Sequence, residues 1–209
     1  MGRKNSEERR EEIVDALLST MAEHGYAKAS LSKVAAAAGL TQGLLHYHFK
    51  SKQEILVTLT ERLVDAQLAS MEAAVLTKKS APEKLKALLD AFLAVGETAD
   101  PDAVAAWVTI GAESIRQPKI QAEFEKALHA FGAQIAAIIE AGVEDGEFDP
   151  GEVSTPACVA AILAVIQGYF TLAATAREVI PAGSAALASW QMVQGLVGLK
   201  TIQGGDHGL

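Results

Sequence analysis

Apolar residues recur three and four positions apart along most of the chain, and residues that favour helix starts precede these stretches. Asn5 with Glu8 forms a capping-box pattern, and helical spacing then continues to Gly25. Similar start signals predict further helices that begin at or near Ser30, Thr41, Ser51, Ser80, Asp100, Lys119, Pro156 and Gly183. Because no alternating pattern of useful length occurs, we predict an all-α fold of about nine helices.

The longest of the early helices is expected to run from Ser51 to about Lys79. Composition agrees with helices, since 50% of the residues are apolar and only 5% are aromatic. The single cysteine, Cys158, excludes an internal disulfide and a multi-cysteine zinc site. The charged N-terminus lacks the apolar segment of a secretory signal, so a soluble cytoplasmic protein is expected.

Two long segments near the C-terminal end carry no charge. They meet the length criterion for membrane spans, but their alanines and scattered Thr, Ser and Gln make them only mildly apolar. A soluble helix that is apolar on all sides is buried on all sides. We therefore interpret residues about 155–177 and 183–201 as a homodimer interface and not as a membrane hairpin. Small residues at Ala160, Ala164 and Gly168 would allow close helix approach.

The net charge of −8 is unevenly distributed along the chain. Residues 1–52 carry eight Lys and Arg against six Asp and Glu, whereas residues 53–209 carry ten against twenty. This asymmetry indicates that the N-terminal quarter meets a partner that the remainder does not. An excess of two positive charges is a weak field, so a nucleic-acid interpretation depends on where the charges lie.

The turn "AAGLT" at residues 37–41 joins two short predicted helices. A glycine in such a turn is typical of a helix-turn-helix, whose second helix enters the major groove of DNA. There Gln42 can pair with adenine and Leu44 can contact a thymine methyl group. Gly43 leaves room for close approach of the backbone.

Three polar side chains follow at the end of that helix and the start of the next. Tyr47, His48 and Lys52 offer hydroxyl, imidazole and ammonium groups that favour a phosphate. The alternative, that His46 and His48 hold a metal, is disfavoured because residues two apart on a helix do not face each other. We expect neither a metal site nor a cofactor.

The stretch "GYAKASLSKVAAAAGLTQGLLHYHFKSKQEIL", residues 25–56, resembles the DNA-binding domain of the tetracycline-repressor-like (TetR/AcrR) transcription regulators. Matching positions are Gly25, Tyr26, Ser30, Ala35, Ala38, Gly39, Leu40, Thr41, Gly43, Leu45, Tyr47, His48, Phe49, Ser51 and Lys52. His46 replaces the common first tyrosine of the cluster, a variant that resembles the betaine-regulator-like branch. Ala29 stands where a phosphate-contacting threonine is common. The predicted DNA-binding set is Ser30, Thr41, Gln42, Gly43, Leu44, His46, Tyr47, His48 and Lys52.

The resemblance also implies a domain organisation. It gives a three-helix DNA-binding domain over residues 1–50 and a helical bundle over residues 51–203. The bundle would contain a ligand pocket and would dimerise through its last two long helices. The glycine-rich residues 204–209 are expected to be a disordered tail.

Candidate effector-binding residues are isolated aromatic and polar side chains on the otherwise apolar helices of the bundle. The predicted set is Trp107, Ile110, Glu113, Phe124, Phe131, Gln167 and Phe170. Core packing is an equally good explanation for each of them taken singly. An acid beside aromatic rings would suit a cationic or polar effector through charge pairing and cation–π contact.

Enzymatic signatures are missing from the sequence: it contains no nucleophile elbow, phosphate-binding glycine loop or metal-ligand set. We expect a regulator, not an enzyme: a ligand-responsive repressor that a small molecule releases from a near-palindromic double-stranded operator. The alternative is an all-α enzyme or small-molecule carrier whose N-terminal helices serve assembly alone. Residues 39–52 separate the two hypotheses, because an enzyme has no need of that cluster.

Overall fold

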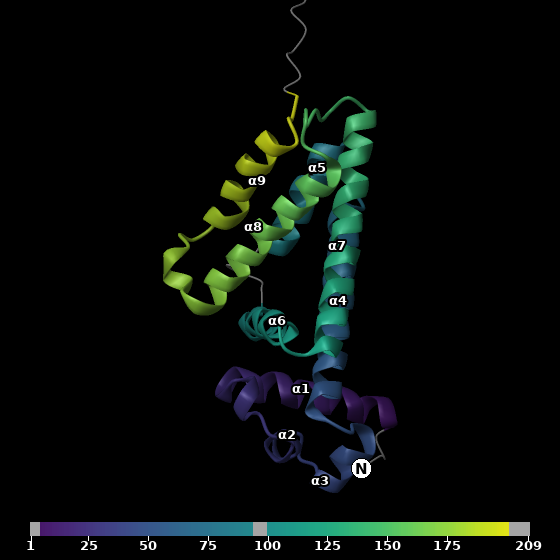
Figure 1. Ribbon diagram of the computed structural model, residues 1–209, viewed down its shortest axis with the longest axis vertical. Coiled ribbons are helices and arrows are strands. Elements are labelled where there is room, and N and C mark those ends of the chain that lie inside the picture. The colour runs from purple at the N-terminus through teal and green to yellow at the C-terminus, as the bar shows by residue number, and fades with distance from the viewer. Residues whose placement is uncertain (1–4, 94–99, 201–209) are drawn as a thin grey trace, which may run out of the picture.

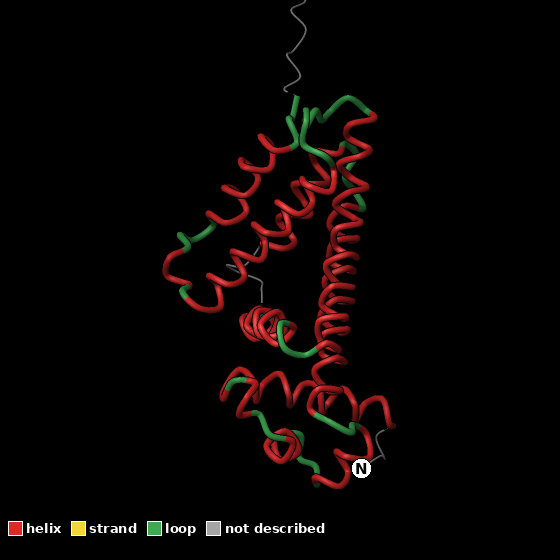
Figure 2. The backbone as a smooth tube through the Cα atoms, in the orientation of Figure 1, coloured by secondary structure: helices red, strands yellow, loops and turns green. Residues whose placement is uncertain are grey.

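The computed structural model describes residues 5–93 and 100–200, and this part of the chain folds into nine α-helices without a strand (Figures 1 and 2). The all-α prediction is therefore confirmed. The helices are α1 (Ser6–His24), α2 (Leu31–Ala37), α3 (Gln42–His48), α4 (Lys52–Val75), α5 (Ala81–Leu93), α6 (Pro101–Ser114), α7 (Pro118–Glu144), α8 (Thr155–Thr175) and α9 (Ser184–Leu196). Two short 3₁₀ turns, η1 (Tyr26–Lys28) and η2 (Arg177–Val179), follow α1 and α8.

The predicted caps are present at the first helices. The Asn5 side chain accepts the Glu8 N–H at 2.8 Å, and the Glu8 carboxylate accepts the Asn5 N–H at 3.1 Å. Both hydrogen bonds of the predicted capping box therefore form. Ser30 and Thr41 cap α2 and α3 by accepting backbone N–H groups three residues further on.

One predicted boundary is wrong, because α4 ends at Val75 and not near Lys79. The carboxylate of Glu83, in the first turn of α5, accepts the N–H groups of Lys79 and Ser80 at 3.1 and 3.2 Å. Lys79 is thus tied to the start of α5. The residues before it form the turn between the two helices.

Figure 1 shows α1–α3 at one end of the molecule and the long helices α4 and α7 rising from them. Helix α4 contacts α5 and α7, and α6 contacts α1, α4, α7 and α8. Helix α8 packs against α6 and α7, and α9 lies at the edge of the bundle away from α4 and α7. Helix α6 therefore lies between the N-terminal helices and the bundle.

Buried apolar residues form two clusters. The bundle cluster centres on residues such as Leu85, Leu89 and Ile135. The N-terminal cluster contains the buried residues of α1–α3 and extends into three later helices. Its members there are Ile55, Leu56 and Leu59 of α4, Ala106 and Ile110 of α6, and Ile120 of α7. A boundary at residue 50 would cut through this cluster, and the predicted tail, residues 204–209, lies outside the described residues.

Helix α8 is, within the described residues, the one helix long and apolar enough to cross a membrane, and 17% of its apolar window is buried. It packs on α6 and α7 on one side. Its other side is exposed, and so is part of α9. We call this surface the α8–α9 face: Ala160, Ala164, Gly168, Leu172, Leu187 and Met192.

Candidate DNA interface and effector cavity

The turn between α2 and α3 requires a glycine. Gly39 has a φ of 66°, a left-handed conformation that side chains disfavour. The next residue, Leu40, donates its N–H to the Ala35 carbonyl at 2.9 Å, which closes the turn. Thr41 then caps α3 by accepting the Leu44 N–H at 3.2 Å. The result is the predicted helix-turn-helix.

Two fully buried residues, Leu45 and Phe49, attach α3 to the N-terminal core. The opposite side of the helix is exposed, with Leu44 at 40% and Tyr47 at 80% of their surface. Together these exposed residues form the recognition face, defined here as Gln42, Gly43, Leu44, His46 and Tyr47. The half-buried His48 lies edge-on to the Tyr47 ring, with 5.1 Å between ring centroids. Ser30 and Thr41 are exposed at the N-termini of α2 and α3.

Two cationic side chains stabilise the backbone around α3 by hydrogen bonds to carbonyl groups. Arg10 of α1 donates to the His48 carbonyl at 2.7 Å, and its guanidinium lies 4.0 Å above the Phe49 ring. Lys52 donates to the Tyr26 carbonyl at 2.6 Å and lies 4.0 Å from the Tyr26 ring centroid. An ammonium has three N–H groups, so a phosphate would have to use those that Tyr26 leaves. Burial lowers the pKa of Lys52.

A polar cluster links the start of α4 and the turn η1 to the end of α6. Gln53 donates to the Gln117 side-chain oxygen at 2.9 Å, and Gln117 donates to the Glu113 carboxylate at 2.6 Å. Burial raises the pKa of Tyr26, a hydrogen bond with Gln117 lowers it, and the Glu113 charge raises it. Glu113 therefore interacts with Gln117 and Tyr26, close to the DNA-binding helices.

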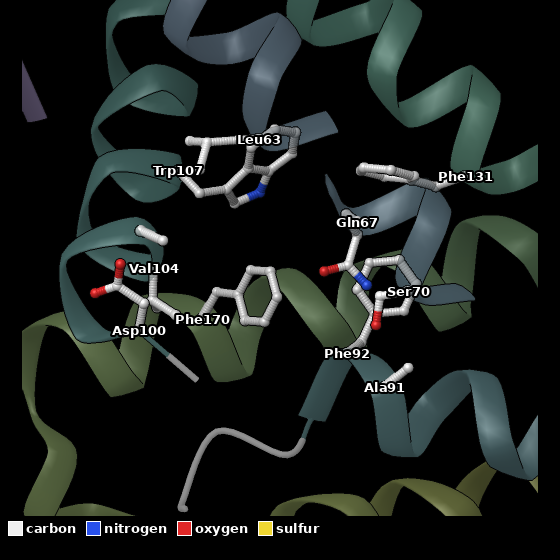
Figure 3. Close-up of a pocket in the computed structure, with 11 residues that line it drawn as sticks. Leu63, Gln67, Ser70, Ala91, Phe92, Asp100, Val104, Trp107, Phe131 and Phe170 are labelled. Carbon is white, nitrogen blue, oxygen red and sulfur yellow. The ribbon is translucent and has the colours of Figure 1, made fainter. Parts of the chain in front are cut away.

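A cavity of about 270 Å³ lies among the bundle helices (Figure 3). Its lining residues are Leu63, Gln67, Ser70, Ala91, Phe92, Asp100, Ala103, Val104, Trp107, Phe131 and Phe170. Four of these, Phe92, Trp107, Phe131 and Phe170, form an aromatic box. Ring centroids are 5.4 Å apart for Phe92–Phe131, 5.9 Å for Trp107–Phe131 and 6.4 Å for Phe92–Phe170. Ligand pockets begin near this volume, so the cavity suits a small molecule.

Polar groups in this cavity are few. Among the described lining residues, only Asp100 carries a full charge, and its carboxylate also caps α6 by accepting the Asp102 N–H at 2.9 Å. Gln67 and Ser70 of α4 are the neutral polar members. The Trp107 indole N–H donates to the Gln167 side-chain oxygen at 3.1 Å. A negative charge beside an aromatic box favours a cation.

The predicted effector residues divide into three groups. Trp107, Phe131 and Phe170 line the cavity. Phe124 and Gln167 contact Trp107 from outside that lining, Phe124 with 5.0 Å between ring centroids. Ile110 and Glu113 belong elsewhere, Ile110 in the N-terminal core and Glu113 in the cluster with Gln117.

Helix geometry explains why Glu113 lies outside the cavity. Six residues turn an α-helix by about 240°, and Glu113 therefore faces away from Trp107. The acid of the cavity is Asp100, which the sequence showed only as a helix cap. Phe92 and Gln67 were not predicted, although both lie on apolar helix faces where an aromatic or an amide could have indicated a site.

Both the helix-turn-helix and the bundle match known protein families. Residues 13–59 match the model of bacterial regulatory proteins of the tetR family, and residues 81–197 match the C-terminal domain of BetI-type transcriptional repressors. The chain is 28% identical over 187 residues to the HTH-type transcriptional regulator BetI of Paraburkholderia phytofirmans, covering 81% of this chain and 95% of that protein.

A second regulator and one solved structure are also similar to the chain. The chain is 35% identical over 74 residues to the fatty acid metabolism regulator protein of Bacillus subtilis, which is 35% of this chain and only 38% of the relative's length. A transcriptional regulator from Saccharomonospora viridis, solved in complex with choline, has the same fold with a TM-score of 0.77 and 23% identity. That alignment covers 92% of this chain and 96% of the regulator. The helix-turn-helix and the match of the C-terminal half together show that this chain belongs to the tetR family of bacterial regulatory proteins, with a BetI-type C-terminal domain.

Proposed function

We propose that this chain is a cytoplasmic, homodimeric transcription repressor that leaves a near-palindromic operator when a small organic cation enters its cavity. One observation carries the proposal. Helix α4 begins at Lys52, directly after the recognition helix, and lines the cavity through Leu63, Gln67 and Ser70. The same rigid element therefore touches both sites.

The recognition face supports operator binding. Gln42 and Leu44, with His46, are placed to contact base edges. Tyr47, His48 and Lys52, together with the Ser30 and Thr41 hydroxyls, would contact the flanking phosphates. Phosphate contacts set the position on DNA, whereas the α3 side chains select the sequence.

The cavity supports a cationic effector. The four rings of the aromatic box line the cavity, and Asp100 supplies the opposite charge. A regulator of the same fold was solved in complex with choline, a quaternary ammonium cation, which fits the same chemistry. A cavity of about 270 Å³ limits the effector to a small molecule.

The α8–α9 face supports dimerisation. Leu187 and Met192 of α9 are 62% and 52% exposed, and the small residues Ala160, Ala164 and Gly168 of α8 are exposed as well. A second copy of the chain would cover this face and bring two recognition helices to one DNA duplex. Their spacing must match one helical turn of DNA, about 34–36 Å, or a multiple of it.

Effector binding would act by changing that spacing. Gln67 lies 15 residues after Lys52, which is about 22 Å along the helix axis. A tilt of α4 by roughly 5° about its cavity end would then move the recognition helix by about 2 Å. A hundredfold loss of operator affinity requires about 2.7 kcal/mol of difference in effector affinity between the two packings.

Fluorescence anisotropy tests the proposal. A duplex from the region upstream of the chain's own coding sequence should bind at least about 1,000-fold more tightly than a scrambled duplex at equal salt. Addition of choline should release it. Equal affinity for the two duplexes would refute the regulator and favour the alternative, an enzyme or carrier whose N-terminal helices serve assembly.

A further inference from the structure

The cavity contains a buried hydrogen-bond donor that the protein does not use. Among the buried side-chain nitrogen and oxygen atoms of the described residues, two have no hydrogen-bond partner: Nε2 of Gln67 and Oγ of Ser189. Ser189 lies in α9 and is not among the cavity's lining residues. Gln67 lies in the cavity wall, and Figure 3 shows its amide among the rings of Phe92, Phe131 and Phe170.

An unpaired amide nitrogen at this place is costly to the folded protein. A leucine or methionine would cover the same apolar wall without a buried, unsatisfied N–H group. Native proteins satisfy nearly all buried donors, so an exception at a ligand cavity suggests that the partner belongs to the ligand. The other donor nearby, the Trp107 indole, already has the Gln167 oxygen as its partner.

We propose that Gln67 is a specificity-determining residue whose amide donates a hydrogen bond to an uncharged oxygen of the bound cation. The proposal rests on the proposed cationic effector and narrows its class. The effector then has two ends: an ammonium group inside the aromatic box and a hydroxyl or similar neutral acceptor that reaches Gln67. A carboxylate at that end is disfavoured, because Asp100 lines the same small cavity and repels it.

Three probes separate the two ends of the ligand. Choline carries a cation and a hydroxyl, propyltrimethylammonium replaces that hydroxyl by a methyl group, and glycine betaine has a carboxylate in place of the hydroxymethyl group. Titration calorimetry on the full-length protein should show choline binding about 10- to 100-fold more tightly than propyltrimethylammonium, because the latter leaves the amide unpaired. Betaine should bind more weakly than choline.

The variant Gln67→Met keeps the side-chain length and removes the donor. Its ratio of choline to propyltrimethylammonium affinity should fall to about one, and its melting temperature should equal or exceed that of the wild type. The matched control is Ser189→Ala, which removes the other unpaired polar atom and should leave the wild-type ratio unchanged.

The outcomes are distinct for the two proposals. If the wild type binds both cations but Gln67→Met keeps the wild-type ratio, the role of Gln67 is refuted and the cationic effector stands. If the wild type binds the two cations equally, the role of Gln67 is also refuted and the cationic effector stands. If the wild type binds none of the three probes, the cationic effector is refuted, and the role of Gln67 falls with it.

Discussion

Arginine in place of Gly168 tests the homodimer proposed for the α8–α9 face. A Cβ atom built on Gly168 meets no atom within 4 Å, so the protomer itself has room for a side chain there. Replacing an interior helix glycine also improves helix propensity by as much as about 1 kcal/mol. The substitution should therefore leave the folded protomer intact.

In the dimer the same side chain would be buried without a partner. An uncompensated buried charge costs about 3–5 kcal/mol, and the two-fold symmetry introduces it twice. The lower value, counted twice, gives a total of about 6 kcal/mol. This corresponds to a dimer dissociation constant weakened by roughly 10,000-fold. At micromolar concentration a nanomolar dimer would then become a monomer.

Sedimentation velocity between nanomolar and micromolar concentrations measures this shift. Gly168→Ala is the matched control, because it adds a Cβ atom without charge and should remain a dimer. Circular dichroism should show equal helix content in both variants, and only Gly168→Arg should lose operator binding. A Gly168→Arg protein that dimerises as tightly as the wild type would place the interface on another surface.

Three further substitutions test the remaining sites. Gln42→Ala should cost roughly 1–3 kcal/mol of operator affinity at one base position and leave random-DNA binding nearly unchanged. Lys52→Met should lower the melting temperature, because the Tyr26 carbonyl loses its donor, and should reduce the salt slope of DNA binding by about one per protomer; an unchanged slope would exclude the phosphate contact. The Lys79 and Ser80 N–H groups lower the pKa of Glu83 below 4.5, so its stabilising effect is complete above pH 4.5 and is lost as pH falls through the folded-state pKa. The free energy of unfolding of Glu83→Gln, measured with urea, should accordingly depend less on pH in that acidic range than that of the wild type.

Local signals predicted the helices well. The capping residues Asn5, Ser30 and Thr41 make the expected hydrogen bonds, because a cap depends on residues three positions away in the same chain. Exposure along the recognition helix could be predicted in the same local way, since burial of Leu45 determines which of its neighbours in α3 are exposed. Interactions within a few residues could thus be predicted from sequence.

The cavity could be predicted only in part. Its walls come from five helices, and which of their faces meet is decided by packing between residues far apart in the chain. Trp107 and Phe131 were found because large aromatics on apolar helices are scarce in this sequence. Asp100 was not expected in the cavity because its role as a cap explained it fully, and Glu113 lies outside the cavity because proximity in sequence does not fix direction on a helix.

Helix α6 belongs to both buried clusters at once: Trp107 packs in the bundle, whereas Ala106 and Ile110 pack with the N-terminal helices. Heat should therefore melt the described chain in one calorimetric transition, because neither cluster is complete without this helix. A fragment that stops before α6 would leave the core around Ile55 and Leu56 open to water. Exchange of DNA-reading domains between relatives would succeed only if residues such as Ile110 moved with them, so these two parts of the chain are constrained to change together.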